Sequence, residues 1–138
     1  MRKGALEEGR RWVEQAKEDL KWAKELARLG GYHLARFLAQ QVAEKALKGY
    51  LYGQGEAIVL GHSVERLCEV ASSYDPRFSE KRKTWATLDA YYVPTRYPNA
   101  VLDSIPARID TESVAKEAVS LAEEVVHLVG KALGLGES

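Results

Sequence analysis

The sequence predicts an all-α fold, an up-and-down helical bundle of four main helices plus one short helix, built by one domain over residues 1–138. Three observations support this prediction. Apolar residues recur at steps of three and four over long stretches, all four prolines lie between residues 76 and 106, and no stretch alternates apolar and polar residues as a β-strand does. Because proline is the strongest helix breaker, we expect long helices on both sides of a punctuated middle.

Two long helices are expected before residue 53. The first runs from about residue 5 to about residue 29 and ends at Gly30 and Gly31, since glycine readily adopts the left-handed conformation that ends helices. The second spans residues 32 to 52, and its small alanine side chains allow a neighbouring helix to come close. The apolar positions of the first helix are Val13, Ala16, Leu20, Ala23 and Ala27, and those of the second are Leu34, Ala35, Leu38, Ala39, Val42, Ala43, Ala46 and Tyr50.

The remaining elements follow from caps and breakers. Ser63 is the expected N-cap of a short helix, and Asp75 with Pro76 makes a turn into a further helix. That helix ends near Val93, because Pro94 disfavours helical geometry in the residue before it. A final helix starts at Asp110 or Thr111 and continues to about Leu133. Apolar positions are Val64, Leu67, Cys68 and Ala71 in the short helix, Phe78, Trp85, Leu88 and Tyr92 in the next, and Val114, Ala118, Leu121, Val125 and Leu128 in the last.

Composition limits the possible function classes. Twenty Lys plus Arg balance twenty Asp plus Glu, so bulk charge gives no reason to expect binding to nucleic acid or to an anionic membrane. The single cysteine, Cys68, excludes a disulfide framework, and its apolar neighbours indicate a small buried side chain rather than a reactive thiol. No signal peptide and no run of about 18 apolar residues is present, so we expect a cytoplasmic protein without membrane contact.

Charge is uneven along the chain. Residues 1–52 carry a formal charge of +4, residues 53–75 carry −3, residues 76–108 carry +3 and residues 109–138 carry −4. A basic second helix beside the basic corner PTRYP, residues 94–98, would form a local anion site. The alternative is a solvated surface whose uneven charge has no function.

The corner YYVPTRYP, residues 91–98, is the first candidate binding element. Two prolines fix its backbone, Arg96 offers a planar fork of donors that suits phosphate, and Tyr97 or Tyr91 can stack on a base. In the structural alternative Tyr92 fills the core, Tyr91 and Tyr97 wedge the turn, and Arg96 caps a helix carboxyl end.

A second candidate element is QQVAEKALKGYL, residues 40–51. Gln41, Lys45 and Lys48 recur at steps of four and three along one helix face. Such a face can bind nucleotide edges and phosphates, or it can form a polar seam between two helices. The residues alone leave both interpretations open.

Neither a metal nor a cofactor is expected. Glu124 and His127 have the Glu-x-x-His spacing of di-iron bundles, but neither His33 nor His62 has a glutamate three residues before it to complete such a site. His62 lies just outside the expected Ser63 cap, where packing or hydrogen bonding at the start of the helix is the simpler role than acid–base work.

The order of these motifs resembles the HEPN domain, a presumed nucleotide-binding domain of higher eukaryotes and prokaryotes. The resemblance covers nearly the whole chain. It is carried by AxxDLxxA at residues 16–23, GYxxAxF at 31–37, QQxAEKALK at 40–48, GHSxxxL at 61–67 and RYP at 96–98. Similarity to that family implies a helical bundle, usually a homodimer, often encoded beside a minimal nucleotidyltransferase and often connected with toxin–antitoxin systems.

Many HEPN proteins are ribonucleases with the motif Arg, four to six residues, then His on a late helix. No histidine follows Arg96 at that distance, and the pair Arg28 and His33, which has the right separation, straddles the predicted glycine turn. The resemblance therefore implies binding more than cleavage.

The leading hypothesis is a protein that binds a nucleotide or RNA phosphate. Arg96, Lys45 and Lys48 would contact phosphate, Gln41 would line the same groove and Tyr97 or Tyr91 would stack. One alternative is a ribonuclease in which a residue other than the usual histidine, such as His62, acts as base. The other is a pure interaction module for a nucleotidyltransferase. The small-residue face of the second helix suits close contact with a second copy, which would complete a homodimer.

Overall fold

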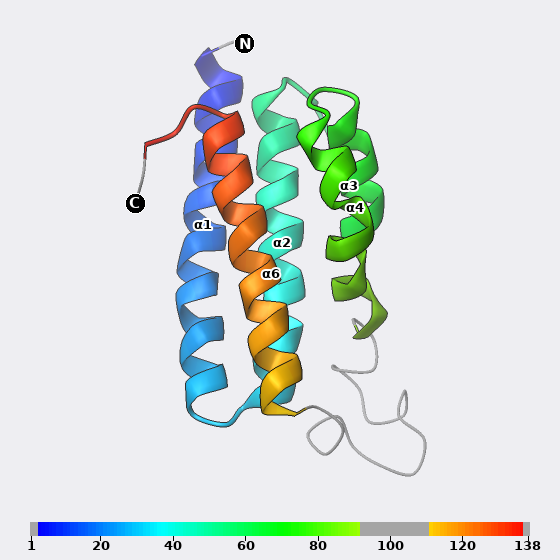
Figure 1. Ribbon diagram of the computed structural model, residues 1–138. Helices are drawn as coiled ribbons and strands as arrows, with labels where there is room; N and C mark the ends of the chain where they lie inside the picture. The colour runs from blue at the N-terminus through cyan, green and yellow to red at the C-terminus, as the bar shows by residue number, and fades with distance from the viewer. Residues whose placement is uncertain (1–2, 92–110, 137–138) are drawn as a thin grey trace.

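A computed structural model describes residues 3–91 and 111–136 (Figure 1). Its long helices are α1 (Lys3–Arg28), α2 (Tyr32–Gly53) and α6 (Glu112–Ala132). The shorter elements are α3 (Val64–Ser72), α4 (Arg77–Trp85) and the 3₁₀ helix η1 (Ala86–Tyr91). No strand occurs within the described ranges. The all-α prediction is confirmed.

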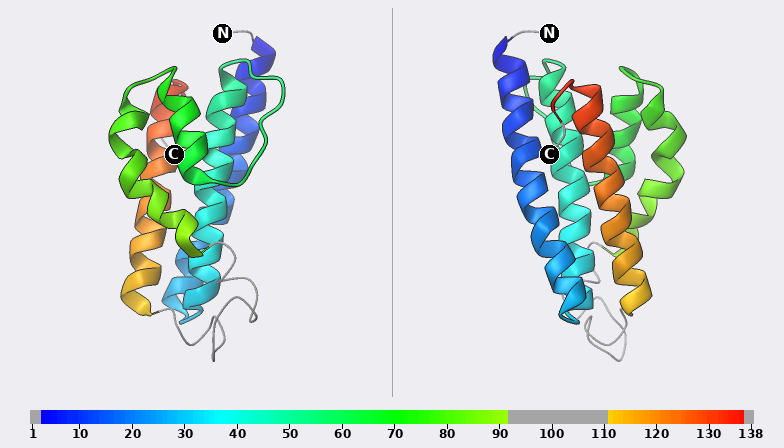
Figure 2. Two further views of the ribbon diagram at one scale, coloured as in Figure 1. Left: turned by 90° about the vertical axis from the view of Figure 1, so that its right-hand side faces the viewer. Right: turned by 60° about the vertical axis from the view of Figure 1, so that its left-hand side comes forward.

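The helix α2 is the centre of the bundle. It runs antiparallel to α1, and α6 packs against both, so that the three long helices form a three-helix unit (Figures 1 and 2). On the other side of α2 lie α3 and α4, which pack on each other, and η1 contacts α2, α3 and α4. A polar side chain on the α3 side of α2 is therefore covered by a second layer.

The turn between α1 and α2 forms where the two glycines predict it. Gly30 has a φ of 91°, and the Gly31 amide donates to the Leu26 carbonyl at 2.8 Å. The alanines of α2 are fully buried within the chain's own core: Ala35, Ala39, Ala43 and Ala46. These residues therefore do not supply an exposed face for a second copy, because they are already buried within the chain itself.

Both sequence-predicted caps are present. The Ser63 hydroxyl accepts a hydrogen bond from the Arg66 amide at 3.1 Å, and the Thr111 hydroxyl accepts one from the Val114 amide at 3.3 Å. Each bond satisfies an amide that has no partner inside its own helix. Local sequence chemistry thus determines where α3 and α6 begin.

The predicted helix up to Val93 differs from the structure. The α-helix ends at Trp85, and the chain continues as the 3₁₀ helix η1. With three residues per turn, the side chains of Trp85 and Leu88 fall on the same side, and both are buried. The tighter winding also brings Asp89 to the start of α3, as described below. Tyr92 and Val93 lie outside the described residues.

The core is aliphatic between the long helices and aromatic between α2, α3 and α4. Phe78 lies with its ring centroid 4.6 Å from that of Tyr50 and 6.3 Å from that of Trp85. Cys68 is buried, as predicted, and its thiol donates to the Phe78 carbonyl at 3.0 Å. Burial raises the pKa of this thiol to about 11, so Cys68 is not a reactive thiolate. None of the helices in the described ranges has the length and hydropathy to span a bilayer.

Candidate functional site

Three polar side chains of α2 are buried, and two of them, Gln40 and Glu44, contact His62 just before α3. Gln40, Glu44 and Lys48 are 1%, 8% and 9% exposed, and they follow one another at steps of four along the helix. Buried polar groups are expensive unless they are hydrogen-bonded, so their partners define how this region is built.

Glu44 is the hub of this buried network. Its Oε2 accepts a hydrogen bond from Lys48 Nζ at 2.9 Å and lies 3.0 Å from His62 Nδ1. The His62 side chain is 65% exposed, whereas that of Glu44 is 11% exposed. The buried Glu44 carboxylate therefore holds the exposed His62 imidazole in one orientation, and Lys48 compensates the charge of the carboxylate.

Gln40 fixes the backbone of the same histidine. Its Nε2 donates to the His62 carbonyl at 2.7 Å and lies 3.5 Å from Asp89 Oδ1. Its Oε1 is buried without a hydrogen-bond partner within the described residues. His62 is consequently held both at its backbone and at its ring. This reduces the conformational freedom that it would lose on binding a ligand.

Asp89 ties η1 to the first turn of α3. Its carboxylate accepts hydrogen bonds from the Val64 amide at 2.7 Å, the Glu65 amide at 2.9 Å and the Ser63 hydroxyl at 3.1 Å. An anion at the positive end of a helix dipole stabilises the helix. Asp89 is therefore a second cap of α3, and it lies at least 24 residues further along the chain than the groups it binds. Tyr91, the last residue of η1, follows two residues later.

The sequence-predicted site residues do not all meet here. Lys48 belongs to the buried network, but Lys45 is turned toward α1, where it donates to Asp19, and Gln41 is half-buried. Because both lysines are ion-paired with carboxylates, neither is an uncompensated cation in the chain by itself. Arg96 and Tyr97 lie outside the described residues, and for Tyr91 only its place at the end of η1 is described.

Sequence reasoning missed the roles of Gln40 and Asp89 and the pairing of Glu44 with His62. A signal for the α2 residues was present, since Gln40, Glu44 and Lys48 recur every four residues along one face, although Gln41 and Lys45 beside them are polar too. Asp89 carries no local signal, because its partners belong to another helix.

The other histidines do not gather into a site. Arg28 pairs with Glu25 within α1, and His33 lies beyond the glycine turn at the start of α2. Glu124 accepts a hydrogen bond from Trp85 Nε1 at 3.2 Å. Within the described residues, no three His, Cys, Asp or Glu side chains come together as a metal site would need.

A family model described as the HEPN domain matches residues 10–132, from Arg10 within α1 to Ala132, the last residue of α6. The chain belongs to the HEPN domain family. This confirms the resemblance seen in its motifs.

Two solved structures are similar to this HEPN protein over nearly their full lengths. ST0689, described as an archaeal HEPN homologue, is 35% identical with a TM-score of 0.73, covering 91% of this chain and 97% of that chain. TT1696 from Thermus thermophilus is 37% identical with a TM-score of 0.75, covering 89% of this chain and 96% of that chain. No curated protein matches the chain.

The HEPN motif blocks occupy the elements described above. The QQxAEKALK block forms the middle of α2 and contains Gln40, Glu44 and Lys48, and the GHSxxxL block contains His62 and the α3 cap. Two of the blocks that carried the resemblance therefore build the buried network of this HEPN domain.

Proposed function

We propose that this HEPN protein binds a nucleotide or an RNA phosphate at the surface around His62, where α2, η1 and the start of α3 meet. The observation that carries the proposal is the exposed His62 imidazole, which lies 3.0 Å from the buried Glu44 carboxylate. The backbone carbonyl of His62 accepts from Gln40, whose amide nitrogen is also near the Asp89 carboxylate that ties η1 to α3. We also propose that the protein is cytoplasmic.

The proposed roles rest on chemistry. Arg96 contacts phosphate with its planar guanidinium, Tyr97 or Tyr91 stacks on a base, and His62 adds an imidazole at the same surface. Lys48 supports this surface indirectly through Glu44. Lys45 and Gln41 contribute only if a ligand competes with Asp19 for the lysine.

The partners implied by the family resemblance are part of the same proposal. They are a second copy of the chain, which forms a homodimer, and a minimal nucleotidyltransferase in a toxin–antitoxin type system. A pure interaction module would keep these partners without any nucleotide or RNA ligand.

Arg96→Ala is expected to weaken binding at least tenfold, because a hydrogen bond to a charged group contributes roughly 1.5–3 kcal/mol. Its stability should stay within roughly 0.5 kcal/mol of the parent, as for an exposed substitution. Calorimetric titration with nucleotides and with a short single-stranded RNA measures the first quantity, and thermal melting without ligand measures the second. Arg10→Ala, an exposed arginine on α1 that pairs with Glu7, is the matched control and should change neither.

A sharp drop in melting temperature with unchanged affinity would make Arg96 a structural cap. A parent that binds neither nucleotide nor RNA would leave the interaction module as the function.

The contact between Glu44 and His62 favours a second candidate, RNA cleavage with His62 as base, since a buried carboxylate that orients an imidazole is an arrangement used in acid–base catalysis. We nevertheless expect labelled single-stranded RNA to stay intact with the purified protein, because no histidine follows Arg96 at the family's ribonuclease spacing. Cleavage that disappears in His62→Ala and persists in His33→Ala would establish the second candidate. Cleavage lost in His33→Ala instead would assign it to Arg28 and His33.

A further inference from the structure

The connection between α2 and α3 carries the two most exposed large apolar side chains in the described part of the chain. Ile58 is 71% exposed and Leu60 is 81% exposed. Val59 between them packs partly buried against the core, and its amide donates to the Tyr52 hydroxyl at 3.2 Å. Figure 2 shows this connection as an arc outside the helices. Single exposed apolar side chains are ordinary, whereas neighbouring ones on an anchored backbone favour a binding surface.

A pocket of about 630 Å³ lies beside this segment, between the start of α1 and the end of α2. Four of its seven lining residues are glycine or alanine, among them Ala57 next to Ile58, so little side-chain volume fills it. The other three are Glu8, Tyr52 and Glu56. We call it the Tyr52 pocket, and its volume falls in the range of ligand sites.

The Tyr52 pocket presents an aromatic ring and carboxylates without a cation. Neither Lys, Arg nor His is among its lining residues. The Tyr52 ring stacks on Trp12 with the ring centroids 5.3 Å apart. Trp12 in turn donates from Nε1 to the Glu8 carboxylate at 3.1 Å. The contact between α1 and α2 therefore fixes the ring and the first carboxylate together.

Glu56 is the carboxylate of the pocket that has no cationic partner. It accepts a hydrogen bond from the Tyr74 hydroxyl at 2.6 Å, but it forms no ion pair within residues 3–91 and 111–136. Glu8, by contrast, pairs with Arg11. An ammonium or guanidinium group in the pocket would gain a charge-assisted hydrogen bond from the carboxylate and a cation–π contact from the ring.

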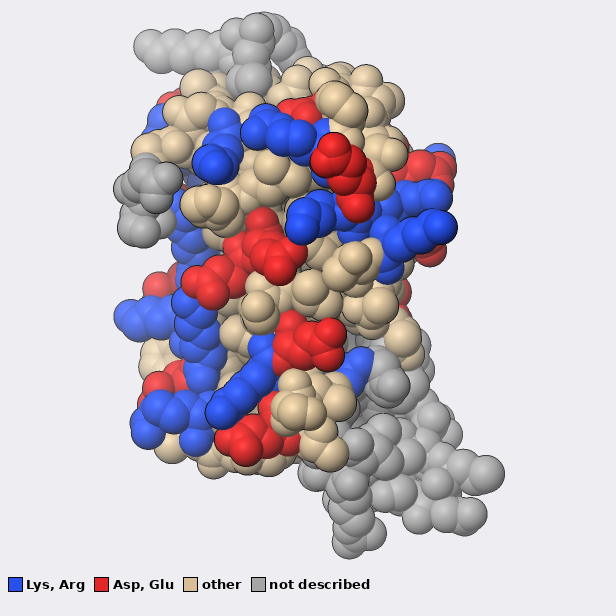
Figure 3. All heavy atoms as spheres, viewed as in Figure 1, with Lys and Arg blue, Asp and Glu red and all other residues tan. Residues whose placement is uncertain are grey.

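The charge around the two exposed aliphatic side chains is also negative. No Lys or Arg occurs from residue 49 to residue 65, a stretch that contains Glu56 and Glu65. Lysines gather elsewhere, since four of them line a groove between α1 and α6, where Figure 3 shows a column of basic side chains over α1. A complementary ligand is therefore positive and partly apolar, and the same carboxylates repel a phosphate.

We propose that the Tyr52 pocket, together with Ile58 and Leu60, docks a segment of a partner protein in which an arginine or lysine stands beside aliphatic residues. The basic side chain enters the pocket against Glu56 and the Tyr52 ring, and its aliphatic neighbours pack on Ile58 and Leu60.

This docking surface is distinct from the proposed nucleotide or RNA site. Tyr52 lies eight residues after Glu44 along α2, which is roughly 12 Å at the rise of an α-helix. The inference needs neither nucleotide nor RNA, and it does not rest on the proposed function.

The test uses two blocked pentapeptides, Leu-Arg-Leu-Arg-Leu and Leu-Glu-Leu-Glu-Leu, titrated into the labelled protein at about 0.15 M salt. Amide chemical shifts in nuclear magnetic resonance spectra report both affinity and position. The arginine peptide should shift the amides of Gly55, Ala57 and Leu60, and the glutamate peptide should shift none of them.

Two double variants test the carboxylates. Glu8→Gln with Glu56→Gln should bind the arginine peptide roughly tenfold more weakly, because the charge-assisted contacts are lost. Glu18→Gln with Glu117→Gln makes the same charge change at exposed residues outside the pocket and should bind as the parent does.

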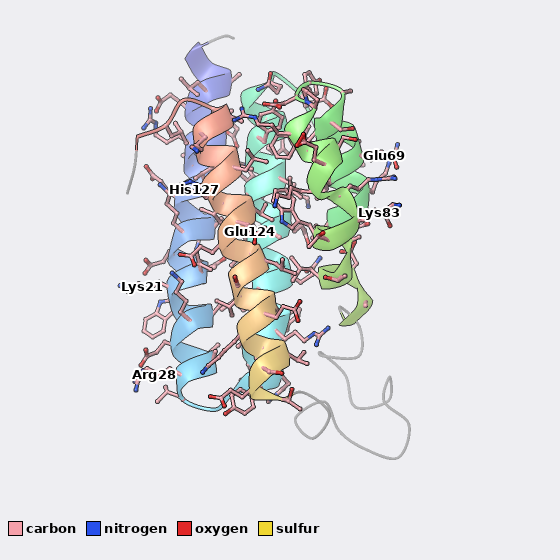
Figure 4. The ribbon with its side chains drawn as sticks, viewed as in Figure 1. Lys21, Arg28, Glu69, Lys83, Glu124 and His127 are labelled. Atoms are coloured by element: carbon pink, nitrogen blue, oxygen red, sulfur yellow. The ribbon has the colours of Figure 1, made fainter. Side chains whose placement is uncertain are left out.

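A third double variant tests the aliphatic part. Ile58→Ser with Leu60→Ser should weaken the arginine peptide roughly tenfold through lost apolar contact, at an unchanged melting temperature. Leu29→Ser is the matched control, because Leu29 is 66% exposed and directly follows Arg28, which Figure 4 shows at the other end of α1. It should leave the affinity unchanged.

Absence of binding of the arginine peptide to the parent would overturn the inference, as would equal weakening in the control variants or equal shifts with the glutamate peptide. Single-stranded RNA that shifts the amides of the Tyr52 pocket would overturn it as well. Arg96→Ala and His62→Ala should keep their affinity for the arginine peptide. Peptide binding lost in these two variants and kept in Glu8→Gln with Glu56→Gln would place the peptide on the His62 surface and overturn the inference, whereas nucleotide and RNA titrations decide the proposed function separately.

Discussion

Glu44→Ala is expected to lower the free energy of unfolding by about 3–5 kcal/mol, the range for removing one partner of a buried ion pair. The side chains of Glu44 and Lys48 are each only 11% exposed, and Lys48 Nζ donates to the Glu44 carboxylate. Without the carboxylate the ammonium group stays buried with its charge uncompensated, and His62 loses the group that orients its ring. Urea unfolding at a fixed protein concentration measures the change.

Two further variants separate the buried charge from the loss of side-chain volume. Glu44→Gln keeps an oxygen that can accept from Lys48 but removes the charge, so its effect should be smaller than that of Glu44→Ala. The double variant Glu44→Leu, Lys48→Met removes both charges and should recover most of the stability, because two apolar groups of similar volume need no partner. A loss below about 1 kcal/mol in Glu44→Ala would show that water already solvates the pair, as it does in exposed ion pairs.

Gly9→Ala is expected to lower the free energy of unfolding by about 2–3 kcal/mol, the upper part of the range for overpacking a close contact. A Cβ on Gly9 would lie 2.7 Å from the Gly49 carbonyl oxygen and 3.1 Å from the Gly53 Cα. Both are backbone atoms of α2, so the clash is relieved only by moving the two helices apart. The substitution therefore destabilises the fold although alanine is the better helix former.

Gly130→Ala is the matched control, because it makes the same chemical change in a helix where a Cβ meets nothing within 4 Å. It should raise the free energy of unfolding by roughly 0.5–1 kcal/mol through helix propensity alone. Denaturant unfolding of both variants measures the two effects in opposite directions. If Gly9→Ala is as stable as the parent, the backbones of α1 and α2 are not in close contact near residue 9.

Much of the fold was predictable because the relevant physics acts within single segments. The apolar period predicted α1, α2 and α6 and all the buried apolar positions of α1, and the hydroxyls of Ser63 and Thr111 marked two helix starts. It was wrong for Leu34 of α2, which is 46% exposed, and it gave only three of the eight buried residues of α6. The failure came after Trp85, where a continuous α-helix was expected and η1 was found. The winding of that segment suits the burial of Leu88 and the contact of Asp89 with α3, neither of which is visible in the local sequence.

The candidate site was predictable only in part. The QQxAEKALK block was singled out, but of the predicted face Gln41, Lys45 and Lys48 only Lys48 belongs to the buried network. Lys45 pairs with Asp19 of α1 instead, and the network runs through Gln40 and Glu44. A one-residue shift on a helix turns a side chain by about 100°. Which of two adjacent polar positions is buried depends on where the neighbouring helices lie, and those positions come from contacts far along the chain.

The sequence by itself determined the long helices, the caps of α3 and α6, most core positions and the HEPN family, because period, capping and motif order are properties of contiguous residues. Only the tertiary structure decided which charges are compensated. It pairs Lys45 with Asp19 and Lys24 with Glu123, places Asp89 on the first turn of α3, and leaves Lys17, Lys21 and Lys131 around one groove. The physical reason is that an ion pair or a cap needs two groups within a few ångströms, and packing brings these groups together from distant parts of the chain.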